Sequence, residues 1–134
     1  MPTYLGTCHC GAIRFEVTGE LQEVTLCNCS LCARNAFLHW EVEPKQFQLH
    51  TSDEVIQDYQ FGTMTSHNFF CKTCGISAFR RSRTSPDQID INVRCLQGVD
   101  ADALEIERFD GKNWDEAYAA SEFASNRGKS NRDT

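Results

Sequence analysis

The chain has 134 residues with a formal net charge of −6, and 40% of its residues are hydrophobic. This length and hydrophobic content suit one domain with a single modest core. No run approaches the ~18 consecutive apolar residues that a membrane span needs, and the negative charge disfavours a nucleic-acid partner. The N-terminus has no basic start and no apolar stretch after it, so it does not resemble a signal peptide. We therefore expect a soluble, cytoplasmic protein.

Short segments with strand patterning cover most of the chain. In residues 12–17 apolar and charged side chains alternate, which is typical of a half-buried strand. Residues 88–95 alternate in the same way, with Cys95 on the apolar face. Turn signals such as Pro44 and Gly62 separate the segments. Further strands are predicted at residues 37–42, 46–50, 54–61, 66–70, 76–81 and 103–109.

One helix is predicted near the C-terminus, over residues 113–124. Asn113 is suited to be its N-cap, and acidic residues follow in the first turn. Trp114, Ala117 and Tyr118 recur at helical spacing on one face. Residues 125–134 are polar and rich in Gly and Ser, so we expect a disordered tail. The sequence thus predicts one all-β domain over residues 1–124 with a short C-terminal helix.

Eight cysteines are the most informative feature of the composition. A reducing cytosol keeps thiols free, and a disulfide within a Cys-x-Cys segment would close a strained, very short loop. Metal ligation is therefore the better interpretation, and small β domains often need such a staple. Zinc takes thiolates in tetrahedral sets that arrive as sequence pairs. Two pairs, each followed by a glycine that lets the backbone turn back, would make one closed site: Cys8 with Cys10, and Cys71 with Cys74.

A third cluster contains Cys27, Cys29 and Cys32 and offers three sulfurs to a second metal. Three protein ligands with an open fourth position is the pattern of catalytic zinc. A zinc ion held by three thiolates carries a net charge of −1, so it is a weak activator of water. It readily takes a fourth sulfur as thiolate. The cluster therefore favours chemistry on a thiol or thioether over hydrolysis.

Spacing alone leaves the ligand sets open. One of Cys8, Cys10, Cys71 and Cys74 could belong to this cluster instead. Cys95 could be the fourth ligand, although free cysteines commonly pack in cores. His39 or His67 could take that place instead. An iron–sulfur cluster would need four cysteines in its own spacing, so two zinc ions suit the seven clustered sulfurs better.

The chain resembles the glutathione-dependent formaldehyde-activating enzyme family, and within it the branch that contains centromere protein V. The resemblance covers about residues 4–120. It is carried by the motifs GTCHCGAIRFEV (6–17), CNCSLC (27–32), FCKTCG (70–75), NVRCL (92–96) and FDGKNW (109–114).

The resemblance implies a β-tent fold, a structural zinc and a second zinc with an open position. The structural zinc would lie at Cys8, Cys10, Cys71 and Cys74, and the open zinc at Cys27, Cys29 and Cys32. The implied activity is that of a carbon–sulfur lyase acting on a small thiol, typified by joining formaldehyde to glutathione as S-hydroxymethylglutathione. A non-catalytic, zinc-stabilised binding module is the alternative, because fold does not fix function.

Two positions depart from the common pattern of that family. Many members have a histidine between the first two cysteines of the third cluster, where this chain has Asn28. Many also have a basic pair after the third cysteine, where this chain has Ala33 and Arg34. Another residue must then move the proton that the chemistry requires, and we expect His39, with Ser30 or water as alternatives.

The basic segment at residues 79–83 has two interpretations. Charged residues are commonly exposed, so a solvated strand edge is the first. A patch for substrate carboxylates is the second, and it is made of Arg80, Arg81 and Arg83, or of Arg34.

Overall fold

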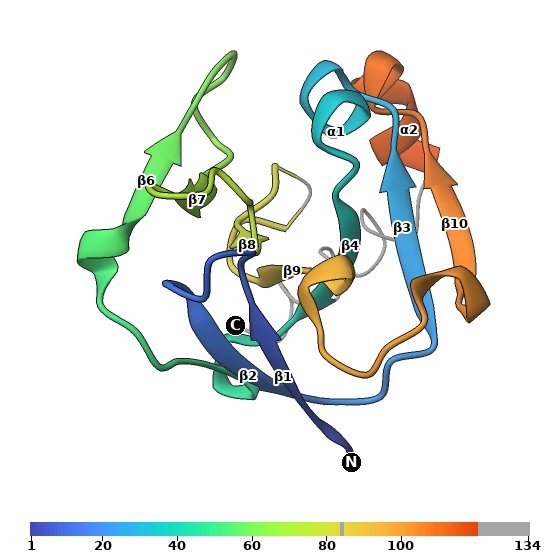
Figure 1. The fold of residues 1–134 in the computed structure, drawn as a ribbon. Coiled ribbons are helices and arrows are strands. Elements are labelled where there is room, and N and C mark those ends of the chain that lie inside the picture. The colour runs from blue at the N-terminus through green and yellow to red at the C-terminus, as the bar shows by residue number, and fades with distance from the viewer. Residues whose placement is uncertain (84, 121–134) are drawn as a thin grey trace.

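The computed structural model describes residues 1–83 and 85–120, and these residues form a mainly β structure (Figure 1). A three-stranded antiparallel sheet has the order β1-β2-β5, and a two-stranded antiparallel sheet pairs β6 with β7. The largest sheet has the order β10-β3-β4-β9-β8, with β10 parallel to β3 and the other neighbours antiparallel. The strands are β1 (Thr3–Thr7), β2 (Arg14–Thr18), β3 (Glu23–Cys27), β4 (Leu38–Val42), β5 (Phe47–Leu49), β6 (Ile56–Tyr59), β7 (Asn68–Cys71), β8 (Phe79–Arg80), β9 (Ile89–Asn92) and β10 (Glu105–Phe109).

Helical structure is short in the described residues. Two α-helices, α1 (Ser30–Asn35) and α2 (Trp114–Ala120), lie near each other at one end of the molecule (Figure 1). The 3-10 turns are η1 (Pro44–Gln46), η2 (Asp53–Val55), η3 (Val93–Cys95), η4 (Ala101–Ala103) and η5 (Gly111–Asn113). No helix among the described residues is long and apolar enough to cross a membrane.

The core joins the three sheets through aromatic side chains. Phe79 of the large sheet lies 4.9 Å from Phe47 and 5.3 Å from Phe69, measured between ring centroids. Phe47 belongs to the β1-β2-β5 sheet and Phe69 to the β6-β7 pair, so one ring contacts both smaller sheets. Phe15 is 1% exposed and packs 5.4 Å from Phe47. Such pairs stabilise beyond the apolar area that they bury.

The predicted mainly β class is confirmed, and each of the eight predicted strands overlaps an observed strand. The sequence analysis missed β1, β3 and α1. It was wrong about residues 88–95, because the strand ends at Asn92 and the chain turns through η3. The polar face expected there is buried as well, with Asp90 at 1% and Asn92 at 6% exposure.

The predicted C-terminal helix is present from Trp114 to Ala120. Asn113, the predicted N-cap, is the residue directly before Trp114 and ends the preceding turn η5. Trp114 and Tyr118 stack with ring centroids 4.7 Å apart, on the face that the spacing indicated. The expected last turn to residue 124 and the expected disordered tail at 125–134 lie outside the described residues.

Candidate metal centres and active site

Four cysteine sulfurs meet where the β1-β2-β5 sheet meets the β6-β7 pair. Cys8 and Cys10 follow β1, while Cys71 ends β7 and Cys74 follows it. We call these residues the four-sulfur group, and their Sγ atoms all lie within 4.8 Å of one another. Cys10 Sγ is 3.7 Å from Cys8 Sγ and 3.6 Å from Cys71 Sγ. This soft, compact donor set could hold a metal ion, and zinc suits it.

Both halves of the four-sulfur group are built in the same way. Gly11 and Gly75 have φ values of 84° and 78°, in the left-handed region that glycine adopts without strain. The backbone N–H of Ile13 donates to Cys8 Sγ at 3.3 Å, and that of Thr73 donates to Cys71 Sγ at 3.4 Å. The backbone N–H of Cys74 is the main cause that lowers the pKa of Cys71. The turn after Cys71 thus favours the thiolate form of that residue.

The other three clustered cysteines meet at the junction of β3 and α1. We call Cys27, Cys29 and Cys32 the three-sulfur group, and their Sγ atoms also lie within 4.8 Å of one another. The Cys29 side chain caps α1 by accepting the N–H of Cys32 at 3.4 Å. Hydrogen bonds from the Cys27 and Cys32 thiols lower the pKa of Cys29 to about 2, whereas contacts with Cys27 and Cys29 raise the pKa of Cys32. The group thus contains three close sulfurs, of which Cys29 favours the thiolate form, and this donor set is suited to a cation.

None of the three residues considered as a fourth ligand belongs to the three-sulfur group. His67 Nδ1 pairs with Asp58 Oδ2 at 2.7 Å, and the His67 backbone bonds to Arg81. Cys95 is half-buried and belongs to neither sulfur group, and burial raises the pKa of its thiol to about 11. His39 Nε2 lies 3.3 Å from Cys32 Sγ, but His39 is not a member of the three-sulfur group.

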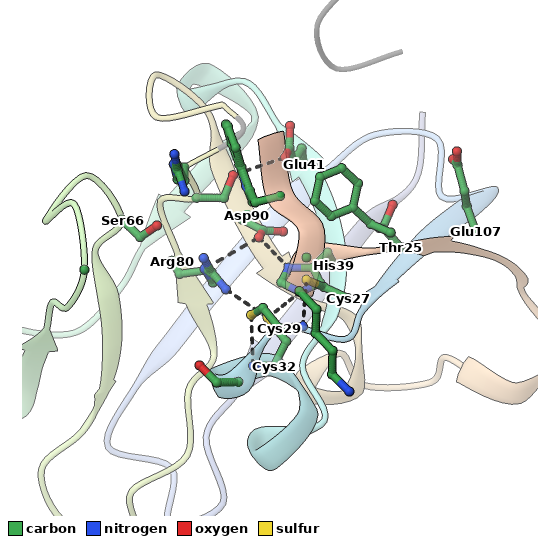
Figure 2. A pocket seen from close by; sticks show the side chains of 18 of the residues that line it. Thr25, Cys27, Cys29, Cys32, His39, Glu41, Ser66, Arg80, Asp90 and Glu107 are labelled. Atoms are coloured by element: carbon green, nitrogen blue, oxygen red, sulfur yellow. Dashed lines mark hydrogen bonds and ion pairs between the residues drawn. The ribbon is translucent and has the colours of Figure 1, made fainter. Parts of the chain in front are cut away.

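His39 is held in a buried network behind Cys32 (Figure 2). Its Nδ1 lies 2.6 Å from Asp90 Oδ2, and its ring packs 4.5 Å from that of Phe37. Asp90 is 1% exposed. Because the carboxylate accepts the proton on Nδ1, Nε2 faces the sulfur with its orientation fixed. Sequence analysis missed Asp90. The sequence held no clear signal, because Asp90 stands on the expected polar face of the alternating segment 88–95.

Arg80 corrects the first interpretation of the basic segment, because it is buried at 7% exposure instead of lying on a solvated edge. Its Nη1 donates to Cys32 Sγ at 3.3 Å, and its Nε lies 3.9 Å from Asp90 Oδ2. Arg83 is half-exposed, lies 3.7 Å above the Trp114 ring and pairs with Asp115 at 3.5 Å. Arg81 donates to the Pro86 carbonyl and Arg34 to the Ser30 carbonyl.

The three-sulfur group forms part of the wall of a pocket of about 730 Å³. His39, Ser30, Arg80 and Arg83 line it, and Arg34 and Arg81 do not. One side comes from the connection between β6 and β7, through Phe61, Gly62 and Thr63. The other comes from α1 and from the segment before α2, which lie across from that connection in Figure 1. Charges of both signs line it, among them Glu23, Glu41, Glu107 and Lys112.

Asn28 joins the cysteine loop to the segment before α2. Its Nδ2 donates to Asp110 Oδ1 at 3.0 Å, and its Oδ1 accepts the backbone N–H of Lys112 at 3.1 Å. Between these contacts lies Gly111, where a Cβ would come within 2.5 Å of Cys27 Sγ and 2.8 Å of Cys29 Cβ. We call these contacts the Asn28 clasp. They give a structural role to the residue that departs from the common family pattern.

Comparison with known proteins agrees with this architecture. A crystal structure of a Rhodobacter sphaeroides protein superposes with a TM-score of 0.70 at 31% identity, covering 77% of this chain and 99% of that one. A Schizosaccharomyces pombe protein named as an uncharacterised lyase is 26% identical over 105 residues, covering 75% of this chain and 73% of its own. Residues 3–110 match the model of the glutathione-dependent formaldehyde-activating enzyme family. The chain therefore belongs to the glutathione-dependent formaldehyde-activating enzyme family.

Proposed function

We propose that this protein is a zinc-dependent carbon–sulfur lyase that acts on a small thiol or on a thiol–aldehyde adduct. The observation that carries the proposal is the three-sulfur group in the wall of the pocket. Among the described residues, no fourth ligand belongs to this group. We further propose that the four-sulfur group binds a second, structural zinc. Its four sulfurs complete a tetrahedral set, whereas the three-sulfur group leaves one position open. The family match and the lyase-named relative support this assignment.

A zinc ion in the three-sulfur group would supply a coordination position that holds the substrate sulfur as thiolate. In the direction of synthesis, a carbon–sulfur bond forms between that sulfur and the aldehyde carbon. The thiol proton leaves and the carbonyl oxygen gains one proton. The reverse direction breaks the same bond and returns the thiol and the aldehyde.

His39 is the proposed carrier of that proton. It lines the pocket, and Asp90 fixes its ring so that Nε2 lies 3.3 Å from Cys32 Sγ. A base that is held by a carboxylate, lines the pocket and lies beside one of the proposed metal ligands is suited to proton transfer there. Ser30 also lines the pocket and is the remaining side-chain alternative.

The charges in the pocket support a substrate with groups of both signs. Arg83 and Lys112 can meet a carboxylate, while Glu23 lines the same pocket and can meet an ammonium group. Glutathione and its S-hydroxymethyl adduct carry groups of this kind beside a thiol. A closed second site would instead favour a binding module without catalysis. The three-member sulfur group and its pocket favour the enzyme.

The direct test is to incubate the zinc-loaded protein with S-hydroxymethylglutathione and a panel of other thiol adducts, and to measure released thiol and aldehyde. The matched control is Cys29→Ser, which removes one sulfur of the three-sulfur group and leaves the four-sulfur group intact. We expect turnover by the natural chain and a loss of about 100-fold or more in the control, because metal chemistry depends on the complete ligand set. Equal rates for the two proteins across the whole panel would refute the lyase assignment.

A further inference from the structure

The three sulfurs of the three-sulfur group have different hydrogen-bond donors. Cys27 Sγ accepts the backbone N–H of Cys29 at 3.4 Å, and Cys29 Sγ accepts the backbone N–H of Cys32 at 3.4 Å. Cys32 Sγ instead has two side-chain partners: Arg80 Nη1, which donates to it at 3.3 Å, and His39 Nε2, which also lies at 3.3 Å. Only this sulfur is therefore reached by a formally charged donor among the described contacts, and that donor comes from β8, 48 positions along the chain.

Arg80 is fixed in place by several contacts. Arg80 on β8 and Asp90 on β9 are direct partners in the antiparallel register, and Arg80 Nε lies 3.9 Å from Asp90 Oδ2. The guanidinium carbon lies 5.8 Å from the centroid of the Phe37 ring. Both residues of the ion pair are less than 10% exposed. A buried arginine needs a partner for its charge, and here the guanidinium lies beside Asp90 and directs Nη1 at Cys32 instead of at solvent.

We propose that Arg80 is a positioning residue of the three-sulfur group: its guanidinium orients the Cys32 sulfur and makes it the least electron-donating of the three metal ligands. This inference rests on the metal proposed for that group. A donor to a ligating sulfur withdraws charge from it, so a metal there is a better acceptor for the substrate sulfur than three equal thiolates would make it. Arg80 then acts through Cys32, and Arg83 and Lys112 remain for substrate carboxylates.

The charges at the group support the same role. Three thiolates, the Asp90 carboxylate, a divalent ion and the Arg80 guanidinium together leave one negative charge. Without Arg80, the same buried groups would leave two negative charges. Excess negative charge away from water is costly, so the group without Arg80 should hold its thiolates, and hence its metal, less strongly.

The test compares zinc binding by Arg80→Met with that of the natural chain, using chelator competition and metal content per chain. We expect the zinc of the three-sulfur group to bind about 10- to 100-fold more weakly in Arg80→Met than in the natural chain, the usual effect of removing a partner of a metal ligand. Cys29→Ser, which should lack this zinc, identifies which of the two affinities belongs to it. The zinc of the four-sulfur group should keep its affinity and reports that the protein is folded. Arg80→Lys keeps the positive charge but loses the planar guanidinium. Its affinity for the three-sulfur zinc should therefore fall between those of the natural chain and Arg80→Met.

Arg81→Met is the matched control, because Arg81 is the next residue, bonds to the Pro86 carbonyl and does not line the pocket. It should leave both zinc affinities unchanged. X-ray absorption at the zinc edge gives a second readout, in which Arg80→Met should alter the sulfur distances of the weaker zinc alone.

Equal affinities in Arg80→Met and the natural chain, with two zinc ions bound to each, would overturn the role of Arg80 and leave the lyase proposal standing. A natural chain that binds a single zinc ion would refute the open metal centre itself. If Arg80→Met lost both zinc ions, Asp90→Asn would distinguish a positioning role of Arg80 from a requirement for folding. It keeps Arg80 but removes the charge that holds it, and selective weakening of the three-sulfur zinc is again expected. Loss of both zinc ions in Asp90→Asn would make the pair a folding requirement and reject the positioning role.

Discussion

The Asn28 clasp shows how one amide can serve two segments at once. The side chain donates to Asp110 and accepts from the Lys112 backbone, so it closes the cysteine loop against the segment that covers it. A hydrogen bond to the charged form of a carboxyl group lowers its pKa. The pKa of Asp110 is lowered, first by Asn113 and then by Asn28. This makes the clasp measurable through Asp110.

Replacing Asn28 by Ala should raise the pKa of Asp110 toward its ordinary value without reaching it, because Asn113 still donates to Asp110. A lowered pKa adds stability above the unfolded value, and that stability is lost as pH falls through the folded value. The variant should therefore lose less stability than the natural chain when pH is lowered through this range. Carboxyl titration by NMR measures the shift, with Asn35→Ala as a control at an amide that bonds to the Phe37 backbone instead. An unchanged Asp110 titration would show that Asn28 does not hold the segment.

At the scale of elements, the sequence predicted the segments whose patterns arise within them. The eight strand segments and the start of α2 have alternating or helical periods of their own. By contrast, α1 has six residues and is capped by the sulfur of Cys29, which is not a usual capping side chain. Of the other missed elements, β1 contains Gly6 and an exposed Leu5. The formation of β1 depends on contacts with other strands, as in the packing of Gly6 on the Phe15 ring of β2.

The candidate site was predictable to a similar extent. Spacing identified the seven clustered sulfurs, and the family resemblance implied the division into four and three that the structure brings together. His39 was also named from the sequence. Asp90 and Arg80 were not recognised as partners, because their positions follow from the register between β8 and β9. Burial on both faces of β9 reverses the usual expectation for a charged residue in an alternating strand.

The turn η5 packs its first residue directly on the three-sulfur group, which leads to a prediction at the element scale. Gly111→Ala would place a Cβ 2.5 Å from Cys27 Sγ and 3.2 Å from the Cys29 backbone nitrogen, so η5 must move away. We expect a loss of about 1–3 kcal/mol in the free energy of unfolding, as for overpacked sites, and weaker zinc binding at the three-sulfur group. Chemical denaturation and chelator competition measure the two effects. Lys112→Ala, in the same turn, is the control, and an equal effect of both substitutions would reject the steric explanation.

At the scale of the whole molecule, the two sulfur groups occupy different positions in the connectivity of the sheets. The four-sulfur group ties residues after β1 to residues at the end of β7, 61 positions apart between Cys10 and Cys71. It therefore joins two sheets that share no strand. The three-sulfur group lies within six residues of sequence, from the end of β3 to the first turn of α1, and closes no such long loop. Cross-links over long loops restrict the unfolded chain most.

This difference predicts unequal losses of stability for two equivalent substitutions. Cys10→Ser should remove one ligand from the staple between the sheets and lower the melting temperature by on the order of 10 °C, since a structural metal contributes directly to folding and each kcal/mol shifts a domain of this size by several degrees. Cys29→Ser should lower it by much less, because the sheets remain joined when the three-sulfur group loses its metal. Thermal unfolding of both variants, with zinc content measured on the same samples, tests the pair. A larger loss of stability in Cys29→Ser would reverse the two assignments and make the three-sulfur group the structural centre.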